Sequence, residues 1–190
     1  MSAQAKTALL LIDFINDLAF DGGPRLLARA LPAAERVLEL KRLARAAGLP
    51  VIYVNDNFDH WRSNFREVVA YCARDGSPGR ELVVMLRPED DDYFVLKPLH
   101  SGFYGTTLEV LLQHLRVERL VLTGLATDVC VLFTANDAYM RGFDLKIPAD
   151  CVAAVEDADH HYVLNYMQRV LKVDTRPSEA LLEALGLVAG

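Results

Sequence analysis

Cysteine is scarce in this sequence. The 190 residues include 3 cysteines, Cys72, Cys130 and Cys151. Their number is odd, and no two of them have the C-x-x-C spacing, which argues against both a disulfide framework and a zinc knuckle. The role of each thiol therefore depends on its own surroundings. We expect Cys72 and Cys151 to be structural.

Long apolar runs and an excess of positive charge are also absent. The apolar run at residues 8–12 ends at Asp13, is too short to span a membrane and is not followed by a small-residue cleavage site. The 20 Lys and Arg against 26 Asp and Glu give a formal net charge of −6, which argues against a broad surface for nucleic acid or anionic lipid. We therefore expect a cytoplasmic protein that binds neither nucleic acid nor membrane.

Glycine and proline are not abundant enough to suggest disorder. The chain has 11 Gly and 8 Pro, with 52% hydrophobic and 24% charged residues, and this composition excludes disordered and collagen-like chains. A length of 190 residues favours one domain over two. We expect a single domain over residues 1–190.

Strand and helix patterns alternate along the chain. Short apolar runs typical of buried strands occur at residues 8–12, 51–54, 93–96, 120–123, 145–147, 151–155 and 171–173. Patterns typical of helices occur at residues 26–44, 62–73, 106–115, 128–142, 158–170 and 177–186. Strands separated by helices predict a Rossmann-like α/β fold, a three-layer α/β/α sandwich with a mostly parallel six-stranded sheet.

Local patterns refine this prediction. Residues 74–92, rich in Gly, Pro and acidic side chains, predict a long surface loop. The pattern Thr106-x-x-Glu109 predicts a capping box at the start of a helix. Thr127 is a candidate N-cap for the helix that begins near Asp128.

Polar side chains lie where several predicted strands end. Asp13 ends the first strand, Lys97 ends the third, and Cys130 lies in the first turn of the helix after the fourth. Parallel strands bring their carboxyl ends to one edge of the sheet, where ligands bind. The backbone N–H groups and the dipole at a helix N-terminus favour a thiolate, and a neighbouring carboxylate can accept the thiol proton. The sequence therefore predicts Cys130 as a nucleophile beside Asp13 and Lys97.

Longer motifs surround these residues. Cys130 lies in GLATDVCV at residues 124–131, which TANDA at residues 134–138 and Gly142 continue. These motifs resemble the signature of the isochorismatase-like cysteine hydrolases, a superfamily that includes nicotinamidase and N-carbamoylsarcosine amidohydrolase. Residues 8–13 are similar to the family's first strand with its catalytic Asp, and residues 97–106, KPLHSGFYGT, to its lysine segment K-x-x-x-S-x-F-x-x-T. The resemblance covers residues 6–188, with Gly102 where Ala is usual.

The resemblance implies a role for each matching residue. Cys130 would be the nucleophile, Asp13 the general base and later acid, and Lys97 the third member of a catalytic triad. Ala126 would follow a non-proline cis peptide bond, and its amide and that of Cys130 would form the oxyanion hole. The implied reaction is hydrolysis of a C–N bond in a small amide, carbamoyl or related substrate through a thioester, without a cofactor. The family also implies a homo-oligomer, either a dimer or a tetramer.

The sequence departs from the nicotinamidase pattern T-x-D-x-H, which supplies a metal site. Asp56 keeps the position of the carboxylate, but Phe58 occupies the position of the histidine. His60 could substitute, yet one Asp and one His do not complete a site with three or more protein ligands. We therefore expect no metal. The alternatives are a nicotinamidase-like amidase with an altered metal site and a non-catalytic binding or scaffold protein of the same fold.

Aromatic residues near the predicted site are candidates for substrate binding. Phe14 follows Asp13, Phe103 lies in the lysine segment, and Trp61 follows the second strand. Such side chains can form an apolar wall beside reactive groups. These residues are therefore candidates to line the substrate pocket, and the alternative is that they pack in the core or at an interface.

Overall fold

A parallel sheet forms the centre of the protein. The computed structural model describes residues 6–58, 61, 62, 64–184 and 187. Its strands are β1 (Thr7–Ile12), β2 (Val51–Asp56), β3 (Tyr93–Lys97), β4 (Arg119–Leu125), β5 (Asp144–Lys146) and β6 (Val152–Ala153). The order is β3-β2-β1-β4-β5, with β6 paired to β4, and every pair is parallel. The predicted six-stranded parallel sheet is confirmed.

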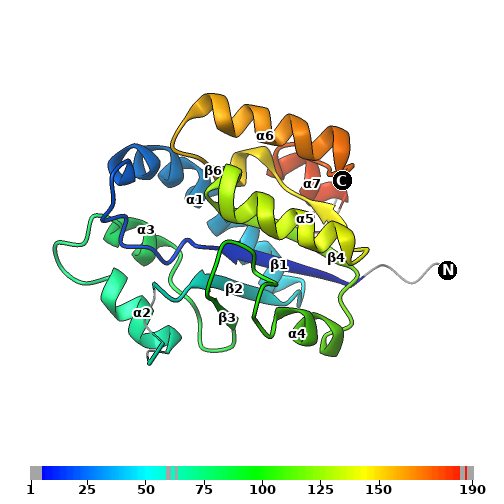
Figure 1. Ribbon diagram of the computed structural model, residues 1–190. Coiled ribbons are helices and arrows are strands. Elements are labelled where there is room, and N and C mark those ends of the chain that lie inside the picture. Colours follow the sequence, from blue (N-terminus) through cyan, green and yellow to red (C-terminus); the bar gives the residue numbers. More distant parts are fainter. Residues whose placement is uncertain (1–5, 59–60, 63, 185–186, 188–190) are drawn as a thin grey trace.

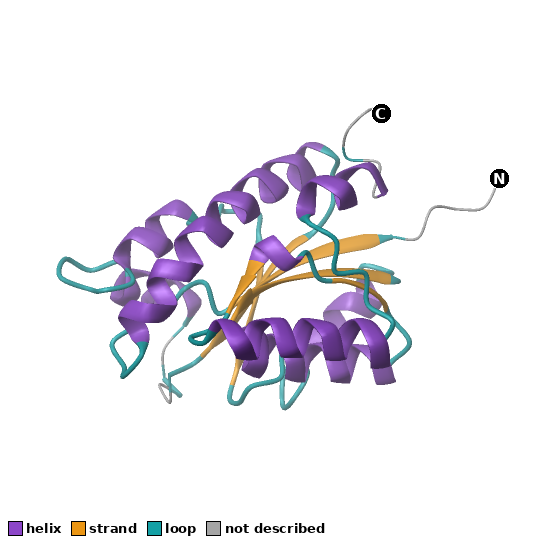
Figure 2. Ribbon diagram, turned by 90° about the horizontal axis from the view of Figure 1, so that it is seen from above, coloured by secondary structure: helices purple, strands orange, loops and turns teal. Residues whose placement is uncertain are grey.

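Helices cover both faces of this sheet (Figures 1 and 2). They are α1 (Gly23–Ala46), α2 (Phe65–Cys72), α3 (Arg80–Met85), α4 (Leu108–His114), α5 (Leu132–Met140), α6 (Asp157–Val170) and α7 (Ser178–Ala184). Two short turns, the π-helix η1 (Thr127–Val131) and the 3-10 helix η2 (Ala149–Cys151), complete the set. No described helix is both long and apolar enough to cross a membrane.

The side chains of β1 show how the two layers of the core arise. All residues of this central strand are buried, and successive side chains point to opposite faces. Leu9 and Leu11 pack with α1, α2, α3 and α7, whereas Leu10 and Ile12 pack with α4, α5 and α6. The chain is therefore the predicted three-layer sandwich, with β1 in the middle of the sheet.

The segment predicted as a long surface loop is partly buried, so that prediction was wrong. Residues 80–85 form α3, and the side chains of Leu82, Val83 and Leu86 belong to the core. The acidic run that follows is not fully solvated either, because the side chain of Asp92 is 1% exposed. A sequence pattern rich in Gly, Pro and Asp does not reveal these distant partners.

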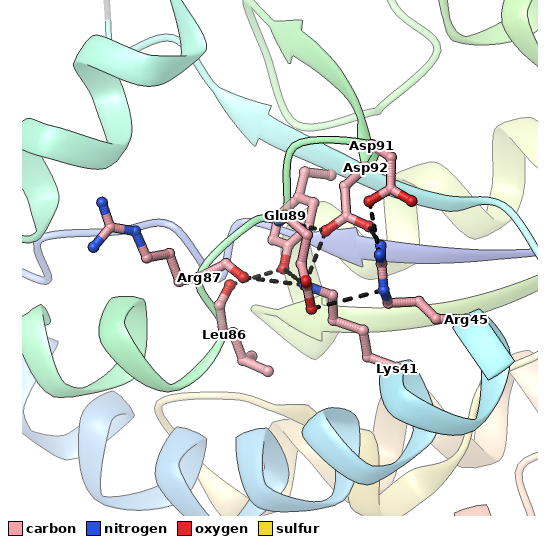
Figure 3. A network of polar contacts seen from close by, with 8 residues as sticks. Lys41, Arg45, Leu86, Arg87, Glu89, Asp91 and Asp92 are labelled. Carbon is pink, nitrogen blue, oxygen red and sulfur yellow. Dashed lines mark hydrogen bonds and ion pairs between the residues drawn. The ribbon is translucent and has the colours of Figure 1, made fainter.

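Lys41 of α1 is the partner of Asp92. Its Nζ lies 2.9 Å from Asp92 Oδ2 and donates to the Tyr53 hydroxyl and the Arg87 carbonyl, each at 3.0 Å. The Tyr53 hydroxyl donates in turn to the Leu86 carbonyl at 2.8 Å. Figure 3 shows this network, which fastens residues 86–92 onto α1 and β2.

Breaking the buried pair is expected to destabilise the protein. Asp92→Asn leaves the buried Lys41 ammonium without its nearest charge, which costs about 3 kcal/mol of the free energy of unfolding. Urea denaturation measures this loss. Asp91→Asn is the matched control, because Asp91 is 75% exposed and contacts Arg45 at the surface. Equal midpoints for Asp92→Asn and the wild type would contradict this account of the network.

Two other local predictions also differ from the structure. Residues 171–173 are not a strand, because α6 ends at Val170, Lys172 has a left-handed backbone (φ 57°) and only an isolated bridge joins Asp174 to Lys146. The predicted capping box does not form either, since α4 begins at Leu108. Thr106 instead accepts from the Leu108 amide at 3.2 Å and donates to a loop carbonyl, that of Gly102, at 2.5 Å.

Candidate active site

The carboxyl ends of three strands converge at one edge of the sheet. Asp13 follows β1, and its amide donates to the Val54 carbonyl of β2 at 3.0 Å. Its left-handed backbone (φ 54°) turns the chain out of the strand. Lys97 is the last residue of β3, and Cys130 lies in η1, which follows β4. The topology therefore brings together side chains from distant parts of the sequence.

The three predicted residues are in contact. The Nζ atom of Lys97 lies 2.8 Å from Asp13 Oδ2 and 3.5 Å from Cys130 Sγ. Asp13 and Cys130 are also close enough for each to shift the pKa of the other. A thiol, a carboxyl and an ammonium thus form a closed set in which a proton can pass from sulfur to oxygen.

The charged pair behind the thiol is buried. Asp13 is 4% exposed and Lys97 is fully buried. Burial raises the pKa of Asp13 above its ordinary 3.8, while Lys97 and hydrogen bonds from Cys130 and the Asp56 amide oppose this effect. Burial alone would lower the pKa of Lys97, but the charge of Asp13, with Cys130 and Asp56, raises it. Lys97 is therefore an ammonium that balances the Asp13 carboxylate.

The protonation state of Cys130 differs from the sequence-based expectation. Burial and the charge of Asp13 raise the pKa of the thiol, more than Lys97 lowers it. The helix N-terminus was expected to favour a thiolate, but the residue lies in a partly buried π-helical turn, next to the Asp13 carboxyl. The resting group is therefore a neutral thiol that can donate its hydrogen to Asp13.

The turn that carries Cys130 begins at a cis peptide bond. The bond joins Leu125 to Ala126, the position that the family resemblance implies. The Ala126 carbonyl accepts from the amides on either side of Cys130, those of Val129 at 3.1 Å and Val131 at 3.2 Å. The assignment of the Ala126 and Cys130 amides to an oxyanion hole stays a prediction.

Glycine at position 124 allows this turn to lie close to β1. Gly124 pairs with Ile12 and has φ 146°, a conformation that other residues rarely adopt. A Cβ there would lie 2.3 Å from the Ile12 carbonyl oxygen. Gly124 therefore lets the chain just before the Cys130 turn lie close to β1, the strand that Asp13 follows.

Thr127 does not cap this turn, so that prediction was wrong. The N-cap position is Ala126, and no side chain caps the helix there. The Thr127 hydroxyl instead lies 2.9 Å from Nδ1 of His160, on α6. A partner 33 residues later in the sequence was not apparent from the local pattern.

Other motif residues fasten the lysine segment to helix α5. The Ser101 hydroxyl donates to the Asp137 carboxylate, and the Gly102 amide donates to Thr134 Oγ1 at 3.0 Å. Gly102 stands where the family usually has Ala. A Cβ at this position would lie 2.8 Å from a side-chain methyl of Val54, so glycine fits here without a clash. These contacts hold the loop after Lys97 against the helix that follows Cys130.

Sequence reasoning missed the role of Asn55. Its fully buried side chain accepts from the Ile15 amide at 3.1 Å and donates to the Ile15 carbonyl at 2.8 Å. These hydrogen bonds fix the chain just after Asp13. A polar residue at the end of an otherwise apolar buried strand is the signal that could have identified it.

The predicted substrate-binding aromatics lie in different surroundings. Phe14 belongs to the core on the α1 side of the sheet. Phe103 belongs to the core on the α5 side, where Arg141 lies 4.7 Å from the centre of its ring. Trp61 is 73% exposed. The structure does not gather these residues into one wall, and their role in substrate binding stays a prediction.

At the carboxyl end of β2, Asp56 is engaged by other groups of the protein. One oxygen of Asp56 accepts from the Phe58 amide at 2.6 Å and the other lies 3.5 Å from Lys97 Nζ. His60 lies outside the described residues. Within the described part of the chain there is no group of three or more His, Cys, Asp or Glu that could hold a metal ion. Asp56 therefore acts as a second negative charge beside Lys97.

Comparison with known proteins gives consistent matches over most of the chain. The family model described as Isochorismatase domain matches residues 7–176. The chain is 38% identical over 181 residues to the isochorismatase family protein YaaI of Bacillus subtilis, covering 95% of this chain and 99% of that protein.

Two further matches carry the names of enzymes. Over 169 residues the chain is 32% identical to ureidoacrylate amidohydrolase RutB of Methylorubrum extorquens, covering 76% of this chain and 68% of that protein. The crystal structure of N-carbamoylsarcosine amidase from Thermoplasma acidophilum matches with a TM-score of 0.69 and 29% identity, covering 92% of this chain and 97% of that one.

Proposed function

Because the chain belongs to the isochorismatase family and is a hydrolase of that family, we propose that it cleaves a C–N bond of a small amide or carbamoyl compound through a thioester on Cys130. The observation that carries this proposal is the contact of the Cys130 thiol with the buried pair of Asp13 and Lys97. The names of RutB and N-carbamoylsarcosine amidase support the substrate class.

The first half of the reaction forms the thioester. The thiol is neutral at rest, so its proton passes to Asp13 as the sulfur attacks the carbonyl carbon. The oxyanion of the tetrahedral intermediate would accept hydrogen bonds from the Ala126 and Cys130 amides, and the loss of one such donor typically costs about 3 kcal/mol. Asp13 then gives the proton to the departing nitrogen, and the C–N bond breaks.

The second half hydrolyses the thioester. Asp13, now a carboxylate again, takes a proton from a water molecule, and the resulting hydroxide attacks the thioester carbonyl. The C–S bond breaks, and the sulfur recovers a proton from Asp13. Lys97 stays an ammonium throughout and keeps Asp13 able to release its proton, since it favours the carboxylate form.

The arrangement favours an enzyme over a scaffold. Burying a charged pair costs several kcal/mol per ion before the pair's attraction offsets it. A binding protein has no need for such a pair against a thiol, whereas the hydrolysis uses all three groups. A metal-dependent amidase is also disfavoured, because Asp56 already contacts Lys97 and the Phe58 amide.

A panel of primary amides and carbamoyl compounds tests the proposal. We expect ammonia release from at least one of them, unchanged by a chelator and lost when iodoacetamide alkylates the enzyme. Activity that disappears with chelator and returns with zinc or manganese would support a metal-dependent amidase instead. Ammonia release from none of the compounds would support the scaffold.

A further inference from the structure

Helix α6 contacts the turn that carries the nucleophile. Thr127, the first residue of η1, is fully buried, and its hydroxyl lies 2.9 Å from Nδ1 of His160. α6 packs against both η1 and α5. The start of the turn is thus tied to a helix that contributes none of the three reactive groups.

The state of His160 suits this contact. Burial lowers the pKa of His160, and His161 and Arg29 add to the effect, while Asp157 and Asp128 oppose it. A neutral imidazole that carries its hydrogen on Nε2 accepts the Thr127 hydroxyl at Nδ1. In this state the Thr127 hydroxyl is the donor and His160 Nδ1 the acceptor.

The turn is also held by the contact of Cys130 with Lys97 and by Val131, which packs into the core. No side chain caps it at Ala126, and within the described residues the buried Oδ1 atom of Asp128 has no hydrogen-bond partner. The backbone contributes the bonds from Val129 and Val131 to the Ala126 carbonyl. The hydrogen bond between Thr127 and His160 holds the first residue of the turn, whereas the contact from Lys97 holds Cys130 near its other end.

We propose that His160 is a positioning residue, which acts through Thr127 to hold the segment from Ala126 to Cys130 in its reactive geometry. The expected effect of His160 on catalysis rests on the proposed function. Its structural effect, the tie from α6 to the turn, can be measured without a substrate.

Variants separate the hydrogen bond from the bulk of the side chain. His160→Leu removes the acceptor and keeps much of the volume, whereas His160→Asn places an amide oxygen near the position of Nδ1. Thr127→Val removes the hydroxyl and keeps the shape. His161→Asn is the matched control, because His161 lies next to His160 on α6 but is exposed.

Amide hydrogen exchange followed by NMR measures directly how firmly the hydrogen bond between Thr127 and His160 holds the turn. We expect the Val129 and Val131 amides to exchange about tenfold faster in His160→Leu and in Thr127→Val, and no faster in the double variant than in the faster single variant. His160→Asn and His161→Asn should keep the wild-type rates. The Leu9 amide of β1, which donates to Pro50, should be unchanged in every variant.

Several results would overturn the inference. These are unchanged exchange at Val129 and Val131 in His160→Leu, equal acceleration at Leu9, and additive effects in the double variant. With a substrate from the panel, the turnover number kcat should fall in the order of the exchange effects, while KM changes less than threefold. If the wild type releases no ammonia, the proposed function fails, and the exchange rates still decide whether His160 holds the turn.

Discussion

Replacement of Cys130 by alanine is expected to lower the rate of amide hydrolysis by about 10⁴-fold or more, the scale found when a catalytic nucleophile is removed. Without the sulfur no thioester can form, although Asp13 and Lys97 remain in place. Ammonia release in the steady state measures the loss. The fold should persist, because Cys130 is a small, partly exposed side chain on a turn.

Cys72→Ala is the matched control for this experiment. Cys72 is fully buried in the core, where a substrate cannot reach its thiol, and burial raises its pKa to about 12. The control loses one sulfur atom, as Cys130→Ala does, but should keep its kcat. If Cys130→Ala retained more than a hundredth of the wild-type kcat, Cys130 would not be the nucleophile.

Asp13→Asn is expected to lower kcat by about 10³-fold, because the amide cannot accept the thiol proton or return it to the leaving nitrogen. The wild type should also lose kcat/KM as the pH falls, since protonation of Asp13 removes the base. Burial raises the pKa of Asp13 above its ordinary 3.8, so the loss should have its midpoint above that value. A pH series with one substrate measures both effects.

Asp21→Asn serves as the control, since Asp21 is exposed and follows the same strand. It should leave both kcat and the acid midpoint unchanged. An Asp13→Asn enzyme with the wild-type kcat, or a wild type with full kcat/KM down to pH 3.8, would remove Asp13 from the role of base.

The fold and the positions of the reactive residues were predictable because both follow from one regular feature. Apolar runs separated by helical patterns predict a parallel sheet, and a parallel sheet brings the residues at its carboxyl ends to one edge. Asp13 and Lys97 each end an apolar run, and Cys130 follows another shortly afterwards. Their contact is a consequence of topology rather than of local sequence.

The features that sequence missed depend on partners far away in the chain. The acidic run ending at Asp92 has the composition of a loop, and only the position of Lys41 on α1 shows that it is buried. Thr127 is of a residue type that often caps helices, and only the packing of α6 shows that its hydroxyl contacts His160 instead. The raised pKa of Cys130 likewise depends on burial and on Asp13, which the helix-terminus rule does not include.

The stated mechanism requires carbon to be bound to one particular sulfur during turnover. Acid quenching of the enzyme within milliseconds of adding a hydrolysed amide, followed by peptide mass spectrometry, measures this directly. We expect an added acyl or carbamoyl mass on the peptide that contains Cys130, and no such mass on the peptides that contain Cys72 or Cys151. Continued turnover with the added mass on another residue, or with a fully alkylated Cys130, would contradict it.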